Sequence, residues 1–480
     1  MRGNEGAQPV PYVARGEPPA GGADSTAFSG QRYAWTVLAM LAITNVLSFM
    51  DRLALNLLGQ PIKESLRFAD WQLGLLTGLG FATTYTLLGL PLARLAETRN
   101  RVTLISLCTL VWSAMTAICG LATTFWQILL FRVGVGVGEA GCLPAAHSLI
   151  TDYFPPRRRA TALAVFGAGI PLGALIGSAA GGVIVDHWGW RAAFIVMGVP
   201  GALFALVVKS VVREAPRGAL DPIESDAKAS DTAPSAWEIL KLLWRNPTAF
   251  HVTAALVSVV LIGSVSSTFL APFLVRKFAL SYTQVGLLIS ATYLIGGIGG
   301  NLAGGLLSDW AGRRDKRWYL WVPGAGILLS IPLNMIAYAQ SSWLAMAVLM
   351  FVPAVLGFTY LAPGFAILHN MVEPRMRATM IAIVQLLSNL IGAGIGPLAG
   401  GVTIDLAARQ FFEHYGLGSF GGTCPGGSAA PGAPPALAQA CHDALTQATS
   451  LTMIGWMPLL LWPALHFYLA SRTVRRDARF

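Results

Sequence analysis

Twelve long apolar segments restrict how this chain can fold more than any other feature of its sequence. Each can cross a bilayer as a helix, which takes about 20 apolar residues. Only 12% of the 480 residues are charged, against about 25% in a soluble protein. The sequence therefore predicts an all-α membrane protein. The expected spans are Tyr33–Gly59, Trp71–Ala93, Val102–Leu121, Phe125–Asp152, Arg159–Val185, Trp190–Val212, Thr248–Arg276, Thr283–Asp309, Trp318–Ala339, Ser342–His369, Arg377–Ile404 and Ser450–Ala470.

Lysine and arginine are distributed unevenly between the two sides of these spans. An even number of spans places both termini on one side, where 25 of the 33 basic residues fall, against six on the other. The remaining two, Arg52 and Arg132, lie within spans. Because basic loops stay in the cytoplasm, we expect both termini there, with the protein in a bacterial inner (plasma) membrane. Topology thus accounts for the net charge of +10, and no nucleic-acid partner is expected.

Internal repetition divides the chain into two halves. Arg159-Ala160-Thr161 and Arg377-Ala378-Thr379 open corresponding spans, and each span ends in a Gly-Gly-Val-x-x-Asp run. Two parallel six-span halves are typical of alternating-access transporters, whose cavity lies between the halves. The expected units are a disordered cytoplasmic tail (1–30), an N-terminal bundle (31–212), a cytoplasmic linker (213–247) with an amphipathic segment at Trp237–Trp244, a C-terminal bundle (248–472) with an extracytoplasmic insert (406–448), and a cytoplasmic tail (473–480).

Ionisable side chains inside the spans are the strongest functional signal. Arg132 and Glu139 are seven residues apart, which puts them on one helix face, roughly 10 Å apart along the axis. Charges in hydrocarbon cost at least ~2.5–3.5 kcal/mol each, so both should face a cavity or a partner. Three glycines between them leave this face thin enough for close approach by a helix or a ligand. A packing salt bridge within the bundle is the simpler alternative.

Asp51 in the first span and Arg132 in the fourth are expected at similar depths, roughly 10 Å below the outer surface. They can meet if these spans are neighbours. We predict that Asp51 and Glu139 are a protonatable pair with Arg132 as their shared counter-ion. A carboxylate whose arginine partner changes with conformation also changes its proton affinity, as proton coupling requires. The alternative for Asp51 is a fixed bridge to Arg52 or Arg132.

A polar stripe runs along one face of the first span, which is unusual within a membrane. We interpret it as the lining of a cavity, in which arginine attracts an anionic headgroup because guanidinium matches phosphate bidentately. Hydrogen bonding between helices is the alternative. The stripe and its neighbours supply the candidate substrate-binding residues Asn45, Ser48, Arg52, Asn56, Arg132 and Glu139.

Several motifs resemble those of a known family. Gly305–Arg314 resembles the signature loop of the major facilitator superfamily, in which a glycine, three residues and an aspartate precede Gly-Arg-Arg. The first-half copy, Gly89–Arg94, has Ala93 in place of the aspartate. Within the superfamily, the first half is similar to the spinster family. The motifs that carry this resemblance are Asp51-Arg52, Arg132 with Gly-Val-Gly-Glu139-Ala140, Asp152-x-Phe154-Pro155 and Trp190-Arg191.

The resemblance implies two pseudo-symmetric six-helix bundles and a proton-coupled carrier of lysophospholipids or sphingosine-phosphate-like lipids. At the cytoplasmic mouth we expect Asp309 to cap a neighbouring helix, at the span beginning with Arg377, and so to latch the inside closed. The remaining residues of this cytoplasmic gate are Arg313, Arg314 and Arg94.

We therefore expect a rocker-switch, proton-coupled transporter of an amphipathic lipid. The C-terminal half is mostly apolar and faces a charged N-terminal half, which suits such a substrate. The alternative is a carrier of small organic anions, such as aromatic or sugar acids. An enzyme acting on lipids would need a convergent nucleophile or metal site, and none is visible, so no catalytic residue, cofactor or metal is expected.

The partners expected of this transporter are protons, its substrate and membrane lipids, and it should act as a monomer. Cys424 and Cys441 lie in the extracytoplasmic insert. Because that side is oxidising in bacteria, they are candidates for a disulfide.

Overall fold

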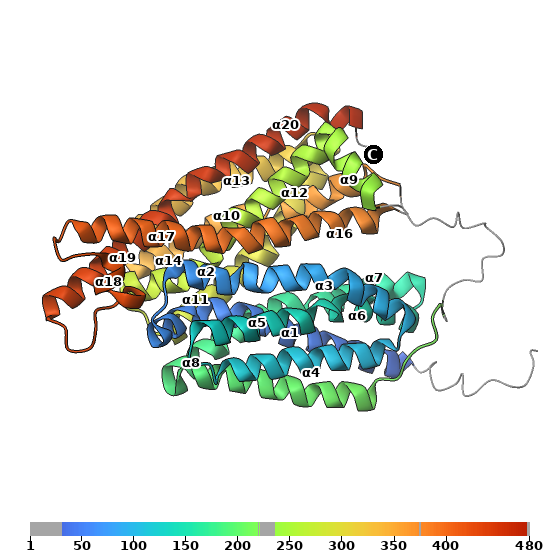
Figure 1. The fold of residues 1–480 in the computed structure, drawn as a ribbon. Helices are drawn as coiled ribbons and strands as arrows, with labels where there is room; N and C mark the ends of the chain where they lie inside the picture. The colour runs from blue at the N-terminus through green and yellow to red at the C-terminus, as the bar shows by residue number, and fades with distance from the viewer. Residues whose placement is uncertain (1–30, 219, 221–235, 374–375, 478–480) are drawn as a thin grey trace, which may run out of the picture.

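The chain folds into two bundles of long helices (Figure 1). The computed structural model describes residues 31–218, 220, 236–373 and 376–477; the predicted tail 1–30 and the end of the second tail, 478–480, lie outside these residues. All regular secondary structure in the described ranges is helical, and eleven stretches there are long and apolar enough to cross a membrane. The longest, Pro156–Val211, contains two crossings, so the predicted twelve-span helical fold is confirmed.

The turn within this longest stretch depends on one glycine. Gly189 has φ +79° and ψ 170°, a conformation that interrupts the helix and that L side chains rarely adopt. Elsewhere, polar caps set the starts of helices, as when the side chains of Asn100 and Thr124 accept backbone N–H groups from the first turn. The first bundle consists of α1 (Gln31–Leu66), α2 (Asp70–Thr77), α3 (Leu79–Thr98), α4 (Arg101–Cys119), α5 (Phe125–Ala140), α6 (Cys142–Tyr153), α7 (Pro156–Gly167) and α8 (Gly169–Val211).

The second bundle contains two π-helical segments, each inside a membrane span. Such segments occur frequently at functional sites. The bundle consists of α9 (Ala236–Arg245), α10 (Pro247–Phe278), α11 (Tyr282–Thr292), π-helix η2 (Tyr293–Gly299), α12 (Gly300–Gly312), α13 (Trp318–Ala339), α14 (Trp343–Gly357), α15 (Leu361–His369), α16 (Arg377–Leu387), π-helix η4 (Ser388–Ile395), α17 (Gly396–Glu413), α18 (Phe420–Thr423), η5 (Pro425–Gly427), α19 (Pro435–Gly455), η6 (Met457–Leu460) and α20 (Leu461–Asp477).

The two bundles meet mainly at one end of the molecule. We call the end where α1 begins and α20 ends the terminal end, and the opposite end the distal end (right and left in Figure 1). The bundles contact each other through α2 with α17, α8 with α11, and α1 with α10. The substantial contacts of α6, α7, α12 and α16 are all with helices of their own bundle. The conformation is therefore closed at the distal end.

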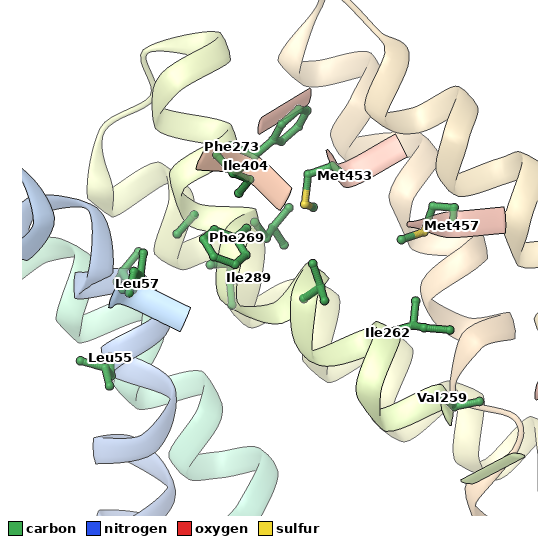
Figure 2. Packing of buried hydrophobic residues seen from close by; sticks show 14 of the residues in the cluster. Leu55, Leu57, Val259, Ile262, Phe269, Phe273, Ile289, Ile404, Met453 and Met457 are labelled. Atoms are coloured by element: carbon green, nitrogen blue, oxygen red, sulfur yellow. The ribbon is translucent and has the colours of Figure 1, made fainter. Parts of the chain in front are cut away.

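The apolar core has the same asymmetry. Leu55 and Leu57 of α1 belong to the same buried cluster as Phe269 of α10 and Ile404 of α17 (Figure 2). A second cluster, which includes Trp112, contains residues of the first bundle alone. Burial of apolar surface thus joins the bundles across the distal half, whereas toward the terminal end the first bundle has a core of its own.

Two segments between the spans are more ordered than loops. Much of the expected insert 406–448 is helical, because α17 continues to Glu413 and α19 begins at Pro435. Cys424 and Cys441 form a disulfide, with their Cα atoms 5.7 Å apart, that ties the intervening loop to α19. The expected amphipathic segment is helix α9, which buries Ile239 and exposes Trp237 and Trp244.

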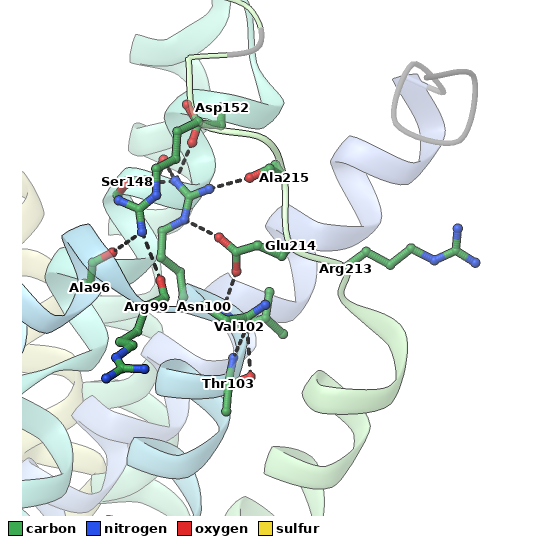
Figure 3. A network of polar contacts seen from close by, with 12 residues as sticks. Ala96, Arg99, Asn100, Val102, Thr103, Ser148, Asp152, Arg213, Glu214 and Ala215 are labelled. Carbon is green, nitrogen blue, oxygen red and sulfur yellow. Dashed lines mark hydrogen bonds and ion pairs between the residues drawn. The ribbon is translucent and has the colours of Figure 1, made fainter. Parts of the chain in front are cut away.

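The segment after α8, which includes Glu214 and Ala215, is held to the terminal end of the first bundle by a network of polar contacts (Figure 3). Arg101 forms ion pairs with Asp152 and Glu214, and it donates a hydrogen bond to the Ala215 carbonyl at 2.7 Å. Its side chain is fully buried. Asp152 also accepts the Gly218 amide at 3.0 Å. The first residues of the predicted linker are therefore part of the bundle.

Replacing Arg101 by alanine is expected to destabilise the first bundle. Asp152 and Glu214 would lose their shared partner, and breaking a buried ion pair in this way costs about 3–5 kcal/mol. The apparent Tm in detergent should fall by several degrees. Arg475→Ala is the matched control, because it removes an exposed pair with Asp315 of a kind that contributes about 0–1 kcal/mol. An unchanged Tm for Arg101→Ala would contradict the anchoring role.

Candidate functional site

A polar cavity of about 190 Å³ lies between the two bundles. Its walls come from helices that are far apart in the sequence. Here α1, α3 and α5 of the first bundle face α10 and the π-helix η4 of the second. Arginine and aromatic side chains line the first-bundle side, and hydroxyl and amide groups line the other. The residues that matter most below are Arg52, Tyr85 and Arg132 from the first bundle, and Ser264, Ser267 and Asn389 from the second.

Arg52 and Glu139 form an ion pair at this cavity. The Glu139 side chain is 1% exposed and that of Arg52 is 23% exposed, so the pair reaches from the interior of the bundle to the cavity surface. The guanidinium also lies over the rings of Phe49, Phe81 and Tyr85, at 5.1, 4.7 and 4.5 Å from their centroids. These cation–π contacts hold the arginine in place on three sides.

Arg132 is buried, and it forms no salt bridge or hydrogen bond with the described residues. The residue is 2% exposed, it lines the cavity, and its Nε and Nη1 atoms have no hydrogen-bond partner among the described residues. This differs from the expectation that Arg132 is the shared counter-ion of both carboxylates, because Glu139 pairs with Arg52 instead. A buried guanidinium without an acceptor is costly. Arg132 is therefore suited to receive an anion from the cavity.

Asp51 lies near Arg132 and Glu139 but is not part of the cavity wall. It is 3% exposed and interacts electrostatically with both Glu139 and Arg132. One carboxylate oxygen accepts a hydrogen bond from the Thr116 hydroxyl at 3.1 Å, while the other has no partner in the described structure. Glu139 likewise has one oxygen without a partner. Each carboxylate thus retains an oxygen that can take up a proton.

The glycines of α5 allow this cluster to form. A side chain at Gly136 would come within 2.4 Å of the Thr84 hydroxyl on α3, and one at Gly138 within 2.6 Å of the Trp112 backbone on α4. The neighbouring helices α3 and α4 therefore pack directly on the backbone of α5 in the segment between Arg132 and Glu139. The predicted close approach is made by helices of the same bundle.

The polar stripe of the first span divides into two functions. Asn56 lines the cavity. In contrast, Asn45 is 7% exposed and donates a hydrogen bond to the Phe166 carbonyl of α7 at 2.9 Å, and Ser48 is buried and is not part of the cavity wall. Their assignment to the substrate site is therefore corrected. Closer to the terminal end, this face of α1 is covered by α7 and α8, so polar groups there bond between helices.

A second, apolar cavity of about 360 Å³ lies inside the second bundle. Its walls are mainly aliphatic and aromatic, and they include Val259, Ile289, Met350 and Phe358. Ser264 and Ser267 line both cavities, so the apolar space adjoins the polar one. The volume falls within the range of about 300–1,000 Å³ that small-molecule sites occupy.

A short chain of hydrogen bonds marks the junction between the cavities. Asn56 of α1 donates to the Ser267 hydroxyl at 3.0 Å, and Ser267 is 2.7 Å from the Tyr293 hydroxyl. Tyr293 is the first residue of π-helix η2. The chain connects the two bundles, and Tyr293 was not among the site residues predicted from the sequence.

The expected gate at the terminal end is not assembled in this conformation. Asp309 does not cap α16; it accepts a hydrogen bond at 2.6 Å from Tyr319 in its own bundle. Arg94, Arg313 and Arg314 are exposed, and Arg314 lies over the Trp310 ring at 5.4 Å. Both α12, which carries Asp309, and α16 belong to the second bundle, where α12 packs mainly against α13, α14 and α15 and makes no substantial contact with α16 in the described structure.

Two six-helix bundles around a central charged cavity, closed at one end, define the chain as a membrane transporter. Residues 41–397 match the Major Facilitator Superfamily. An MFS-type efflux pump of Mycolicibacterium smegmatis is 32% identical, over 78% of this chain and 86% of the pump. Protein spinster homolog 1 of Mus musculus is 29% identical, over 78% of this chain and 74% of the mouse protein.

The solved structures narrow this class further. A crystal structure of a bacterial homologue of the human lysosomal transporter spinster, inward-facing and unoccupied, superposes with a TM-score of 0.87. It is 30% identical and covers 94% of this chain and 100% of its own. The chain therefore belongs to the major facilitator superfamily and is a transporter of the spinster type.

Substitutions in the polar stripe should separate its two functions. Asn45→Ala removes a buried hydrogen bond to α7 and should cost about 1–3 kcal/mol, which thermal unfolding in detergent would register as a lower Tm. Asn56→Ala removes a hydrogen bond to Ser267 that is only partly buried, at the edge of the cavity, so water can replace the lost partner and the effect on Tm should be smaller. Equal Tm values for the two variants would argue against this division.

Proposed function

We propose that this chain is a proton-coupled carrier of single-chain anionic lipids, of the lysophospholipid or sphingosine-phosphate type. It works by rocker-switch alternating access, as a monomer in a bacterial inner membrane, with the terminal end in the cytoplasm. On this assignment the described conformation is inward-facing. The observation that carries the proposal is a cationic cavity that adjoins an apolar one, which matches a charged headgroup joined to a hydrocarbon chain.

The headgroup is recognised by Arg132. Its buried Nε and Nη1 have no acceptor among the described residues, and a phosphate can accept from both because the guanidinium presents its donors in a planar fork. Arg52 adds positive charge, although it is already paired with Glu139. Arg132 is therefore the main contact and Arg52 a secondary one.

The hydrocarbon chain enters the apolar cavity of the second bundle. Burying each methylene group contributes about 0.8 kcal/mol, so a long chain supplies much of the affinity. At the junction, the Ser267 and Tyr293 hydroxyls can bond polar groups of the lipid backbone. A substrate bound in this way contacts both bundles at once.

Protons are coupled to the substrate through net charge. When Asp51, Arg52, Arg132 and Glu139 are all ionised, their charges cancel. A proton on either carboxylate leaves one excess positive charge beside the cavity, which favours an anion. By reciprocity, a bound anion raises the proton affinity of the same carboxylates. Proton and anionic lipid therefore bind cooperatively and cross together.

Asp51→Asn and Glu139→Gln should uncouple transport from the proton gradient. Each mimics a permanently protonated carboxyl group, so the cavity keeps its excess positive charge at every pH. In proteoliposomes, accumulation of lysophosphatidylglycerol driven by a pH gradient should be lost, whereas counterflow exchange of the same lipid should persist. Asp443→Asn in α19, far from the cavity, is the matched control and should retain both activities. Gradient-driven accumulation by both cavity variants would rule out this coupling.

Filling the apolar cavity distinguishes lipids from small organic anions. The polar cavity alone could hold a small acid such as a sugar acid, and that acid would not need the second cavity. Gly263 and Gly357 line the apolar cavity, and a side chain at either meets nothing within 4 Å. Leucine at these positions should therefore occupy the lipid-chain space without disturbing the fold.

We expect Gly263→Leu and Gly357→Leu to reduce binding of lysophosphatidylglycerol at least tenfold. Binding can be measured by tryptophan fluorescence or native mass spectrometry in detergent. Gly89→Leu is the matched control, because a side chain there also meets nothing within 4 Å and lies outside both cavities. Unaltered lipid affinity in both cavity variants, with glucuronate binding to the wild type, would favour the small-anion alternative.

A further inference from the structure

Two aspartates related by the internal repeat cap helices of the opposite bundle at the distal end. Asp186 accepts the backbone N–H groups of Tyr282 and Thr283 at 3.0 and 2.7 Å. Asp405 accepts those of Asp70 and Trp71 at 3.1 and 2.8 Å. In each case these are the first two residues of a helix, α11 and α2. A carboxylate there satisfies free N–H groups and complements the helix dipole.

The glycines of the same repeat bring the backbones together. A side chain at Gly182, four residues before Asp186, would lie 2.2 Å from the Tyr282 carbonyl oxygen. A side chain at Gly401, four residues before Asp405, would lie 2.2 Å from the Asp70 carbonyl oxygen. The Gly-Gly-Val-x-x-Asp run therefore makes the same type of contact between the bundles in both halves of the chain. Its second glycine permits contact between the bundles and its aspartate fastens that contact.

A buried ion cluster reinforces the Asp405 contact alone. Asp70 pairs with Lys63 of its own bundle at 2.5 Å and with Arg276 of the other bundle at 2.7 Å. Both cations are at least 96% buried. Arg276 also contacts Gln60 in the first bundle and Thr449 in its own. The Asp186 contact is exposed and has no such support in the described structure.

The residues of the cluster can move apart with their bundles without leaving a net charge on either bundle. The first bundle contributes Lys63 and Asp70, and the second contributes Arg276 and Asp405. Each set is neutral, so opening the distal end exposes two balanced pairs to water. Because the cost of burying ions is recovered when water returns, the separation is less costly than breaking a single buried pair would be.

We propose that Asp186 and Asp405 are the two latches of a distal gate, released and remade in every transport cycle. The Asp405 latch, with its ion cluster, is the stronger of the two. This inference rests on the proposed alternating access, but not on the identity of the substrate or on proton coupling. The distal gate is therefore itself asymmetric, because one latch is reinforced by a buried ion cluster and the other is exposed.

The test measures distances across the distal end without lipid or proton gradient. Nitroxide labels are attached at Trp188→Cys and Tyr415→Cys, two exposed positions in opposite bundles, and the native free cysteines are buried. Double electron–electron resonance in nanodiscs then gives the distance distribution. Asp405→Ala and Asp186→Ala each remove one cap, which should raise the ratio of distally open to closed molecules by about two- to thirty-fold.

The expected order is Asp186→Ala below Asp405→Ala below the double variant, with a longer distance appearing in each. Asp443→Ala on α19 is the control and should match the wild type. Gel filtration shows whether each variant is folded, and the exposed Asp186 latch remains testable if Asp405→Ala is not. Wild-type distance distributions in the folded latch variants would overturn the proposal. A shift toward open, with no lipid transport by the wild type, would leave the gate standing and reject the lipid function.

Discussion

The cost of holding charge inside a membrane governs this structure. Arg52 and Glu139 meet that cost by pairing with each other and by aromatic contacts around the guanidinium. Asp51 and Arg132 meet it only in part, since each keeps buried atoms without partners among the described residues, and the second oxygen of Glu139 also has none there. An arrangement chosen for stability alone would replace such groups with apolar ones. On the proposed function, the missing partners are a proton and an anion, which come and go during transport.

At the distal end, the cost of burying charged groups is offset in a different way. There every charge of the buried cluster has a partner, and the partners belong to both bundles. In the conformation that is closed at the distal end, the buried charges of the gate therefore have partners, whereas some buried polar atoms at the cavity have none among the described residues. A protein with this distribution is stable when the cavity is empty, yet it responds when a ligand supplies the partners that the cavity lacks. Binding can then shift the balance between the two conformations, because the ligand interacts differently with each.

The sequence predicted features that depend on spacing along one helix. It was less informative about features that depend on which helices are neighbours in space. Apolar length predicted the spans, and the cost of charge in a membrane singled out Asp51, Arg132 and Glu139. The expected depths of the residues in the membrane did not predict that Glu139 would pair with Arg52. This pairing depends on how α1 and α5 are rotated about their own axes. Likewise, Asn45 and Asn56 share a helix face, but α7 covers only one of them. The Gly-Gly-Val-x-x-Asp repeat was visible, whereas the helix starts that its aspartates contact lie about 100 and 335 residues away along the chain.

The two bundles supply different parts of the binding space, and this affects how substrate binding is coupled to the movement of one bundle relative to the other. The charged groups lie in the first bundle and the apolar cavity lies in the second, and the two spaces touch at Ser264 and Ser267. A small acid held by the arginines would contact chiefly the first bundle and would discriminate weakly between relative positions of the two. An amphipathic ligand has its charge in one bundle and its chain in the other, so its binding energy depends on their relative position. That dependence is what a ligand needs in order to drive a conformational change.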